Sequence, residues 1–165
     1  MGGDITPILV EDNVFYLYVI IDLFSRKVIA YRVHYKNNTN LTINTFKDAY
    51  ENRCEPKGTI FHSDRGVQYT SFEYRQLLRS LGIKSSFSNT GNPYDNAVIE
   101  AFFSNLKKEE VNRNQYSSFE DLNKSISKYI DFYNSQQPHS YLKGKTPNEF
   151  EEIYFNKKKK YETSP

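Results

Sequence analysis

The first part of the chain consists of short hydrophobic runs separated by polar breaks. Residues 4–10 and 28–35 have the length and composition of strands, and residues 14–23 form a nearly continuous apolar run. A continuous run of this length is typical of a strand that is covered on both faces of a sheet. Because only short turns separate the three runs, the pattern predicts three consecutive antiparallel strands.

Helix signals begin after the third strand. The asparagine-rich segment 37–40 offers an N-cap for a helix over about residues 41–54. Ser71 is expected to cap a helix over 72–81, which Gly82 would end in the position where glycine is favoured. The remaining patterns predict strands over 59–62 and 83–87, and helices over about 94–109, over 118–134 and from 146 onward. This order predicts an α/β fold in which a five-stranded mixed sheet is flanked by helices.

The composition suits a single packed domain. The 165 residues are 38% hydrophobic and 16% aromatic, enough for a sizeable core. No run approaches the roughly 18 consecutive apolar residues of a membrane span. The N-terminus also lacks the charged and then apolar segments of a secretory signal. One cysteine excludes an internal disulfide and a cysteine-rich zinc site. We therefore expect a cytoplasmic protein.

The basic charge is concentrated at the end of the chain. The formal net charge is +2, and four lysines occupy positions 157–160, so the rest of the chain is slightly acidic. Any affinity for a polyanion must then come from local patches rather than from a global field. The sequence predicts one domain over residues 1–156 and a basic, disordered tail over residues 157–165.

Three carboxylates occupy positions that a fold could bring together. Asp4 opens the first predicted strand, Asp64 follows the fourth, and Glu100 lies on the helix expected over 94–109. If the first and fourth strands pair, Asp4 and Asp64 become neighbours and the helix of Glu100 crosses that edge of the sheet. Carboxylate oxygens suit Mg²⁺ or Mn²⁺, and pairs of such ions about 3.5–4 Å apart promote in-line displacement at phosphorus. The pattern predicts a two-metal site for phosphoryl transfer.

Further side chains are candidates for contact with a nucleic acid. One face of the predicted helix carries residues at spacings of four, three and four: Asn96, Glu100, Phe103 and Lys107. Lys107 would hold a phosphate, and Arg65 and Gln68 follow Asp64 closely enough to touch one. Asn96 would help to order the loop over the site. A solvated surface role is the alternative for all four polar side chains.

Other polar residues are better explained by structure. Asp22 ends a buried strand and is expected to orient the following turn, and Asp95 and Glu109 are expected to be ordinary helix charges. His62 would support the site from behind rather than bind metal. Tyr133, Asn134 and His139 would pack the closing helices, with a contact to DNA as the alternative.

Motifs along almost the whole chain resemble one known family. The matching segments, in order, are residues 4–6, 21–26, 62–69, 91–97, 100–103, 106–107, 133–139 and 146–147. Together they resemble the catalytic core of bacterial insertion-sequence transposases with an orfA–orfB arrangement, which are relatives of retroviral integrases.

This resemblance implies a ribonuclease-H-like fold and a DDE triad at Asp4, Asp64 and Glu100. It also implies two Mg²⁺ ions, for which Mn²⁺ can substitute, bound by the same three residues. Water would cleave the transposon ends, and the freed 3′-hydroxyl would join target DNA, without a protein nucleophile. The implied partners are DNA and further copies of the chain, and the implied location is the nucleoid.

The chain departs from the family pattern at its start, and two alternative functions remain open. Met1-Gly2-Gly3 stands where the family has a longer N-terminal region, so we expect a truncated gene or an expressed fragment that binds DNA weakly. The enzymatic alternative is a ribonuclease-H-like nuclease that hydrolyses DNA without joining it. The non-enzymatic alternative is a catalytically silent, DNA-binding fragment. A joining assay separates the first two, and loss of cation binding in Glu100→Gln would argue against the third.

Overall fold

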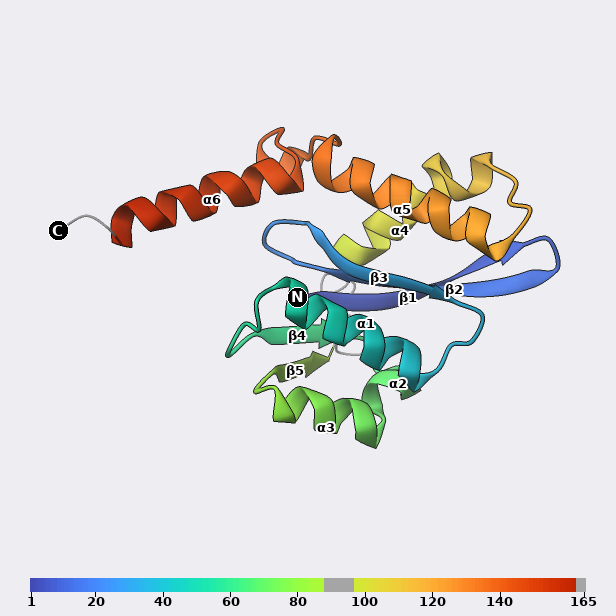
Figure 1. The fold of residues 1–165 in the computed structure, drawn as a ribbon, viewed down its shortest axis with the longest axis horizontal. Coiled ribbons are helices and arrows are strands. Elements are labelled where there is room, and N and C mark those ends of the chain that lie inside the picture. Colours follow the sequence, from blue (N-terminus) through green and yellow to red (C-terminus); the bar gives the residue numbers. More distant parts are fainter. Residues whose placement is uncertain (88–96, 163–165) are drawn as a thin grey trace.

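The computed structural model describes residues 1–87 and 97–162 and shows one five-stranded sheet between two layers of helices (Figure 1). The strands lie in the order β3-β2-β1-β4-β5, with β1, β2 and β3 antiparallel and with β1, β4 and β5 parallel. The strands are β1 Gly2–Val10, β2 Asn13–Ile21, β3 Val28–His34, β4 Ile60–Ser63 and β5 Lys84–Phe87. The helices are α1 Thr39–Asn52, α2 Val67–Thr70, α3 Phe72–Ser80, α4 Ala97–Glu109, α5 Phe119–Ser135 and α6 Pro147–Glu162, with 3-10 turns η2 Val111–Arg113 and η3 Ser140–Leu142. The predicted five-stranded mixed sheet flanked by helices is confirmed.

Each face of the sheet contributes to its own core. Along β2, Leu17, Val19 and Ile21 belong to a cluster with α4 and α5, whereas Tyr18 and Ile20 belong to a cluster with α1 and α3. Figure 1 shows the same division, with α4 and α5 on one side of the strands and α1, α2 and α3 on the other. The continuous apolar run of β2 arises because both of its faces are covered.

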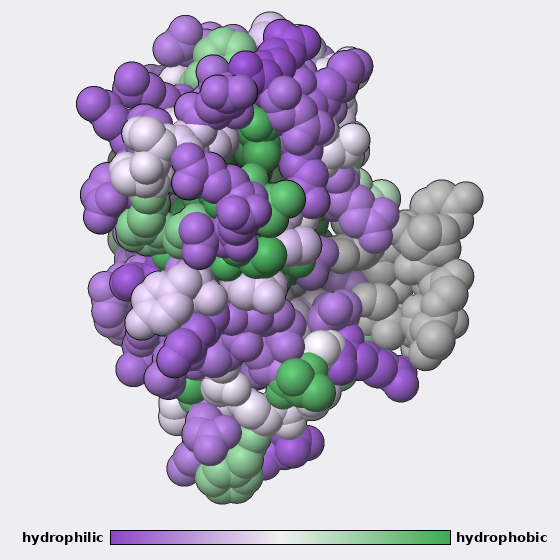
Figure 2. Space-filling model, turned by 90° about the vertical axis from the view of Figure 1, so that its right-hand side faces the viewer, coloured by the Kyte–Doolittle hydropathy of each residue, from purple (hydrophilic) through white to green (hydrophobic). Residues whose placement is uncertain are grey.

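Surface polarity follows these layers. At the end of the molecule that holds the β1–β2 hairpin, hydrophilic residues dominate, and hydrophobic residues form a band across the middle (Figure 2). Leu9 and Val14 of this hairpin are exposed. Within residues 1–87 and 97–162, no helix combines the length and apolar character needed to cross a membrane.

Local capping signals place the helix starts as predicted. The side chain of Asn38 accepts from the backbone of Leu41 at 3.0 Å, and Ser71 and Ser118 cap α3 and α5 in the same way. Before α6, Thr146 and Glu149 form a reciprocal capping box, with side chain to backbone bonds of 2.9 and 3.2 Å. These contacts are local in sequence, which is why the sequence pattern predicts them.

Strand β1 begins two residues earlier than predicted. Gly2 pairs with His62 of β4, and Gly3 lies where a Cβ atom would come within 2.6 Å of the Tyr18 hydroxyl and 2.7 Å of Phe61. Glycine disfavours strands in general, so the sequence pattern excludes these positions. Here the close approach of two aromatic side chains requires it.

The basic end of the chain is drawn as a helix up to Glu162. Helix α6 starts at its capping box and continues through the lysines, which are good helix formers. Near its start, Phe24 packs against Phe150 and Tyr154, with ring centroids 5.3 and 5.0 Å apart. Beyond these contacts α6 extends away from the body of the protein (Figure 1). The division into a domain over residues 1–156 and a tail remains a prediction.

Candidate active site

The pairing of β1 with β4 brings Asp4, on β1, next to the point where the chain leaves β4 and reaches Asp64. Gly2 is in parallel register with His62, and the His62 amide donates to the Met1 carbonyl at 2.9 Å. Asp4 and Asp64 each lie two residues beyond this pair. The predicted pairing of the first and fourth strands is therefore confirmed.

Asp4 lies on the face of the sheet that α4 covers. It is the register partner of Val19, which belongs to the core shared with α4 and α5. Gly2 lies on the same face, because side chains alternate along a strand. A Cβ atom on Gly2 would lie 3.1 Å from the Ile99 side chain, and Ile99 immediately precedes Glu100. Helix α4 therefore packs against the start of β1 as expected.

Glu100 sits beside the buried stripe of α4. This stripe consists of Ile99, Phe102, Phe103 and Leu106, whereas Glu100 is exposed and Lys107 is partly buried. The face predicted to be functional is thus not uniformly polar, since Phe103 belongs to the core. Glu100 and Lys107 follow the edge of the buried stripe, one on each side of Phe103 along the helix axis. Asn96 lies outside the described residues, as does Asp95.

Backbone amides fix the two aspartates. Asp64 Oδ1 accepts from the Gly66 amide, and Asp4 Oδ1 accepts from the Ile5 amide, both at 2.8 Å. A Cβ atom on Gly66 would lie 3.0 Å from Asp64 Oδ1 and 2.8 Å from Gln68 Nε2, so the Gln68 amide folds back toward Asp64. The Arg65 side chain is exposed. Gln68 therefore lies close to the Asp64 carboxylate.

Three buried tyrosines behind the aspartates were not predicted. Tyr18, Tyr69 and Tyr74 are almost fully buried, and the Tyr69 ring lies 5.8 Å from each of the other two. Burial raises the pKa of Tyr69 well above its ordinary value, and the negative charges of Asp4 and Asp64 raise it further. Tyr69 is thus electrostatically linked to both aspartates. Its position in the motif 62–69 was the available signal.

The side chain of His62 also lies close to this site. His62 Nδ1 lies 3.2 Å from the Ser86 hydroxyl of β5, which fixes the ring against the neighbouring strand. This contact agrees with the predicted supporting role.

The three carboxylates do not form a ready-made metal site. Among residues 1–87 and 97–162, no group of three or more His, Cys, Asp or Glu side chains is arranged to hold a metal ion. The structure brings Asp4 and Asp64 to adjacent strands and places α4 on β1, but it does not gather all three carboxylates in one coordination sphere.

A second carboxylate group, at the base of α6, is tied up in ion pairs. Arg53 Nη2 bonds Asp22 Oδ2 at 3.0 Å and also bonds Glu151, which Lys27 Nζ contacts at 3.2 Å. Burial would raise the pKa of Glu151, but the bonds from Arg53 and Ser25 and the charges of Arg53 and Lys27 together lower it.

Asp22 also organises the turn that follows β2. Its Oδ1 atom accepts from the Phe24 amide at 2.9 Å. The predicted role of Asp22 in orienting this turn is confirmed, whereas its ion pair with Arg53 was not foreseen.

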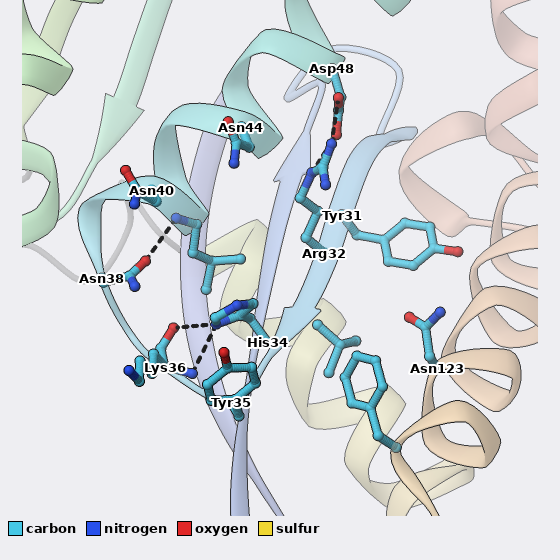
Figure 3. A pocket seen from close by; sticks show the side chains of 13 residues that line it. Tyr31, Arg32, His34, Tyr35, Lys36, Asn38, Asn40, Asn44, Asp48 and Asn123 are labelled. Atoms are coloured by element: carbon cyan, nitrogen blue, oxygen red, sulfur yellow. Dashed lines mark hydrogen bonds and ion pairs between the residues drawn. The ribbon is translucent and has the colours of Figure 1, made fainter.

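A polar cavity of about 670 Å³ lies far from the aspartates along the sheet, between β3, α1 and the start of α5. Its walls are held by their own contacts (Figure 3): Arg32 forms an ion pair with Asp48 at 2.7 Å, and Asn38 caps α1. His34 Nδ1 accepts from the Lys36 amide at 3.0 Å. The polar groups therefore stabilise the edge of the sheet, and we assign no chemistry to this cavity.

Sequence comparisons show that the chain contains an integrase core domain. Residues 1–93 match a sequence profile described as an integrase core domain, and residues 81–147 match a second profile with the same description. The chain is 39% identical over 150 residues to the transposase for insertion sequence element IS904 of Lactococcus lactis, covering 90% of this chain and 59% of that protein. It is 36% identical to the putative transposase InsK for IS150 of Escherichia coli, covering 89% of this chain and 52% of the relative. The chain thus spans little more than half the length of these relatives.

Structural comparisons identify the fold. A chain from the structure of the simian T-cell lymphotropic virus intasome in complex with PP2A regulatory subunit B56 gamma superimposes with a TM-score of 0.76 at 20% identity, covering 90% of this chain and 52% of that one. The integrase catalytic core of HTLV-2, solved with magnesium in a trimeric form, gives a TM-score of 0.71 at 22% identity, covering 90% and 93%. The predicted ribonuclease-H-like fold is confirmed. The chain belongs to the integrase core domain family and is related, within it, to the transposases of bacterial insertion sequences.

Proposed function

We propose that this chain is the catalytic core of an insertion-sequence transposase, which cleaves and joins DNA with the help of divalent cations. The observation that carries the proposal is the parallel pairing of β1 with β4, which sets Asp4 on β1 beside the end of β4, where Asp64 follows. Helix α4 packs on the start of β1 through Ile99, next to Glu100. These three carboxylates are the proposed catalytic residues.

The donor set fits magnesium. Asp4, Asp64 and Glu100 offer only carboxylate oxygens, which are the ligands that Mg²⁺ and Mn²⁺ prefer. The Gly66 amide holds one oxygen of Asp64 and so orients the other for a cation. We propose two Mg²⁺ ions, with Mn²⁺ as a substitute, and the magnesium complex of the HTLV-2 core supports this choice. Bound ions would polarise the scissile phosphate and lower the pKa of attacking water.

The proposed reaction has two displacements at phosphorus. In the first, water attacks a phosphodiester at a transposon end, and the P–O bond to the 3′ oxygen breaks to leave a 3′-hydroxyl. In the second, this hydroxyl attacks a target phosphodiester, forms a new P–O bond and releases the target's 3′ oxygen. No protein side chain becomes covalently attached in either step.

DNA is the proposed partner. Lys107 lies on the same edge of α4 as Glu100, and Arg65 and Gln68 follow Asp64, so these three side chains are the proposed contacts to phosphate. Asn96 is a further proposed contact. The dimeric and trimeric forms of the HTLV-2 core support the proposal that the chain acts as a homo-oligomer on DNA, at the nucleoid in the bacterial cytoplasm.

A strand-transfer assay tests the proposal. The protein is incubated with Mn²⁺, a target duplex and a labelled duplex that carries a pre-cleaved 3′-hydroxyl at a transposon end. The account predicts a joined product from the wild-type chain and none from Asp64→Asn. Hydrolysis without joining would favour the nuclease, and DNA binding without either product would favour the silent fragment. Activity that persists in Asp64→Asn would contradict all assignments at this site.

A further inference from the structure

A second cavity borders α4 on the shoulder opposite Glu100. It has a volume of about 290 Å³ and lies between the turn after β2, helix α4 and the start of η3. Its polar lining comes from Arg26, Asn105, His139, Ser140 and Tyr141. Arg26 and His139 belong to the sequence motifs 21–26 and 133–139, which the proposed carboxylate site does not use.

Arg26 brings an unneutralised positive charge to this cavity. Its guanidinium carbon lies 3.9 Å from the centre of the Tyr141 ring, and in the described part of the chain it forms no ion pair. The nearby carboxylate of Asp22 is bound by Arg53 instead. Stacking on an aromatic ring occupies the flat face of a guanidinium and leaves its N–H edge available for an anion.

His139 provides the inner wall of the cavity. Its ring packs edge-on against Tyr133 at 4.6 Å, and burial lowers its pKa. A hydrogen bond to the Tyr133 backbone partly opposes this effect, while the charge of Arg26 adds to it. Nε2 is buried and has no hydrogen-bond partner among the described residues. A buried polar atom of this kind indicates a site that a water molecule or ligand completes.

The backbone at Arg26 costs free energy. Its φ angle of 63° lies in the left-handed region, where the turn is held by an Arg26 amide to Asp22 carbonyl bond of 2.8 Å. Glycine or asparagine adopts this conformation more easily. The turn geometry therefore does not explain an arginine at this position, whereas its side chain contributes the charge of the cavity.

Helix α4 separates this cavity from Glu100 by a low ridge. Three small exposed residues lie along this side of the helix, Ala97, Ala101 and Ser104, and the exposed Lys108 follows one turn further on. A helix is about 10 Å wide, which corresponds to roughly three nucleotides at 3.4 Å per phosphate along one strand. A single DNA strand can cross this ridge closely, with one phosphate on each shoulder.

We propose that the cavity binds a backbone phosphate of the DNA strand that enters the candidate active site. Arg26 is the cation, and the Ser140 hydroxyl and Asn105 amide are the neutral donors. A water molecule on His139 Nε2 completes the shell. This inference rests on the proposed function and adds a second phosphate contact, on the side of α4 away from Lys107.

The test compares two glycine substitutions that each remove one positive charge from a residue with positive φ. Arg26→Gly empties the cavity of its cation, while Lys143→Gly acts at φ 56° on an exposed loop position outside the cavity. Neither change strains the backbone, so both variants should fold, as a circular dichroism melt will verify. Binding of a fluorescent duplex is measured by anisotropy over a series of salt concentrations.

Arg26→Gly is expected to weaken binding about tenfold and to reduce the salt slope by about 0.9. Lys143→Gly is expected to change neither value. Equal binding by Arg26→Gly and the wild type would overturn the inference, as would an equal loss in both variants. A loss of inorganic phosphate binding without a loss of DNA binding would overturn it too, since the cavity would then be a free-anion site.

The binding measurement and the strand-transfer assay together separate this inference from the proposed function. If the wild type joins DNA and Arg26→Gly binds DNA as tightly as the wild type, only the phosphate site fails. If the wild type binds no DNA at all, the phosphate site and the proposed function fail together.

Discussion

Two groups of carboxylates in this protein are treated in opposite ways. At the base of α6, Asp22 and Glu151 are neutralised by Arg53 and Lys27. At the candidate active site, Asp64 and Glu100 form no ion pair within the described part of the chain. The first group closes a contact between α1, α6 and the turn after β2, whereas the second lies where β1, β4 and α4 meet.

This difference distinguishes carboxylates that stabilise the fold from carboxylates that are available to bind a cation. The negative charge of a partly buried carboxylate beside arginine and lysine is already compensated, and its ion pairs hold elements of the fold together. Carboxylates grouped without protein cations repel one another, and an external cation relieves that repulsion. We therefore expect substitutions at the α6 base to lower stability, and substitutions at the candidate site to lower activity.

Loss of Glu100 should have the largest effect. Glu100→Gln removes a carboxylate oxygen from the proposed metal site, and we expect strand transfer to fall about 1000-fold, or roughly 4 kcal/mol in activation free energy. Because Glu100 is exposed, the melting temperature of the Glu100→Gln protein should equal that of the wild type. Glu109→Gln on the same helix is the matched control: Glu109 accepts from the Tyr129 hydroxyl at 2.9 Å, and its loss should leave joining intact. Equal activity of both variants would contradict the assignment of Glu100.

Loss of Glu151 should show the reverse pattern. Glu151→Gln leaves Arg53 partly buried and only half compensated, which should cost about 2–3 kcal/mol of the free energy of unfolding. This corresponds to a fall of roughly 5–10 °C in melting temperature. Asp48→Asn, which breaks the exposed pair with Arg32, should cost less than about 1 kcal/mol. A stability loss at Asp48 as large as that at Glu151 would remove the distinction between the two pairs.

The contribution of Glu151 should depend on pH. Its folded-state pKa lies below the ordinary value of 4.5, so the ionised form is stabilised in the folded protein. This stability is present above pH 4.5 and is lost as pH falls through the folded-state pKa. In urea unfolding, the gap between wild type and Glu151→Gln should therefore be wide near neutral pH and narrow in acid. A gap that stays constant or widens in acid would show that ionisation of Glu151 is not its source.

The smallest effect should come from the tyrosines behind the site. Tyr69→Phe removes a buried hydroxyl whose raised pKa reflects the charges of Asp4 and Asp64, and we expect a loss of Mn²⁺ affinity of no more than about tenfold. Stability should change by about 1 kcal/mol or less. Tyr74→Phe is equally buried, but the aspartates do not contribute to its raised pKa. Identical Mn²⁺ affinities in the two variants would remove Tyr69 from the site.

The parts of the fold that the sequence predicts are those built from local contacts. Asn38, Ser71, Ser118 and the Thr146–Glu149 capping box all act within three residues of their partners. The start of β1 could not be predicted, because glycine is required at position 3 by the close approach of Tyr18 and Phe61, which are distant in the sequence. The ion pair between Arg53 and Glu151 spans 98 positions, and no periodicity encodes it.

The candidate site follows the same rule. The adjacency of Asp4 and Asp64 follows from the order of strands, which hydrophobic patterning indicates. The helical spacing of Glu100 and Lys107 is also local, but the burial of Phe103 between them depends on how α4 rolls against the sheet. The motif 62–69 marks Tyr69, but its link to the two aspartates depends on how the ring packs against Tyr18 and Tyr74, which the motif does not reveal.

The most direct test of the distinction is a calorimetric titration of Mn²⁺ into three proteins: the wild type, Asp64→Asn and Asp22→Asn. Asp64 belongs to the proposed metal site, whereas Asp22 is already paired with Arg53 at 3.0 Å. The account predicts binding to the wild type and to Asp22→Asn, and a sharp loss of affinity in Asp64→Asn. Undiminished binding to Asp64→Asn, or loss of binding in Asp22→Asn alone, would contradict it.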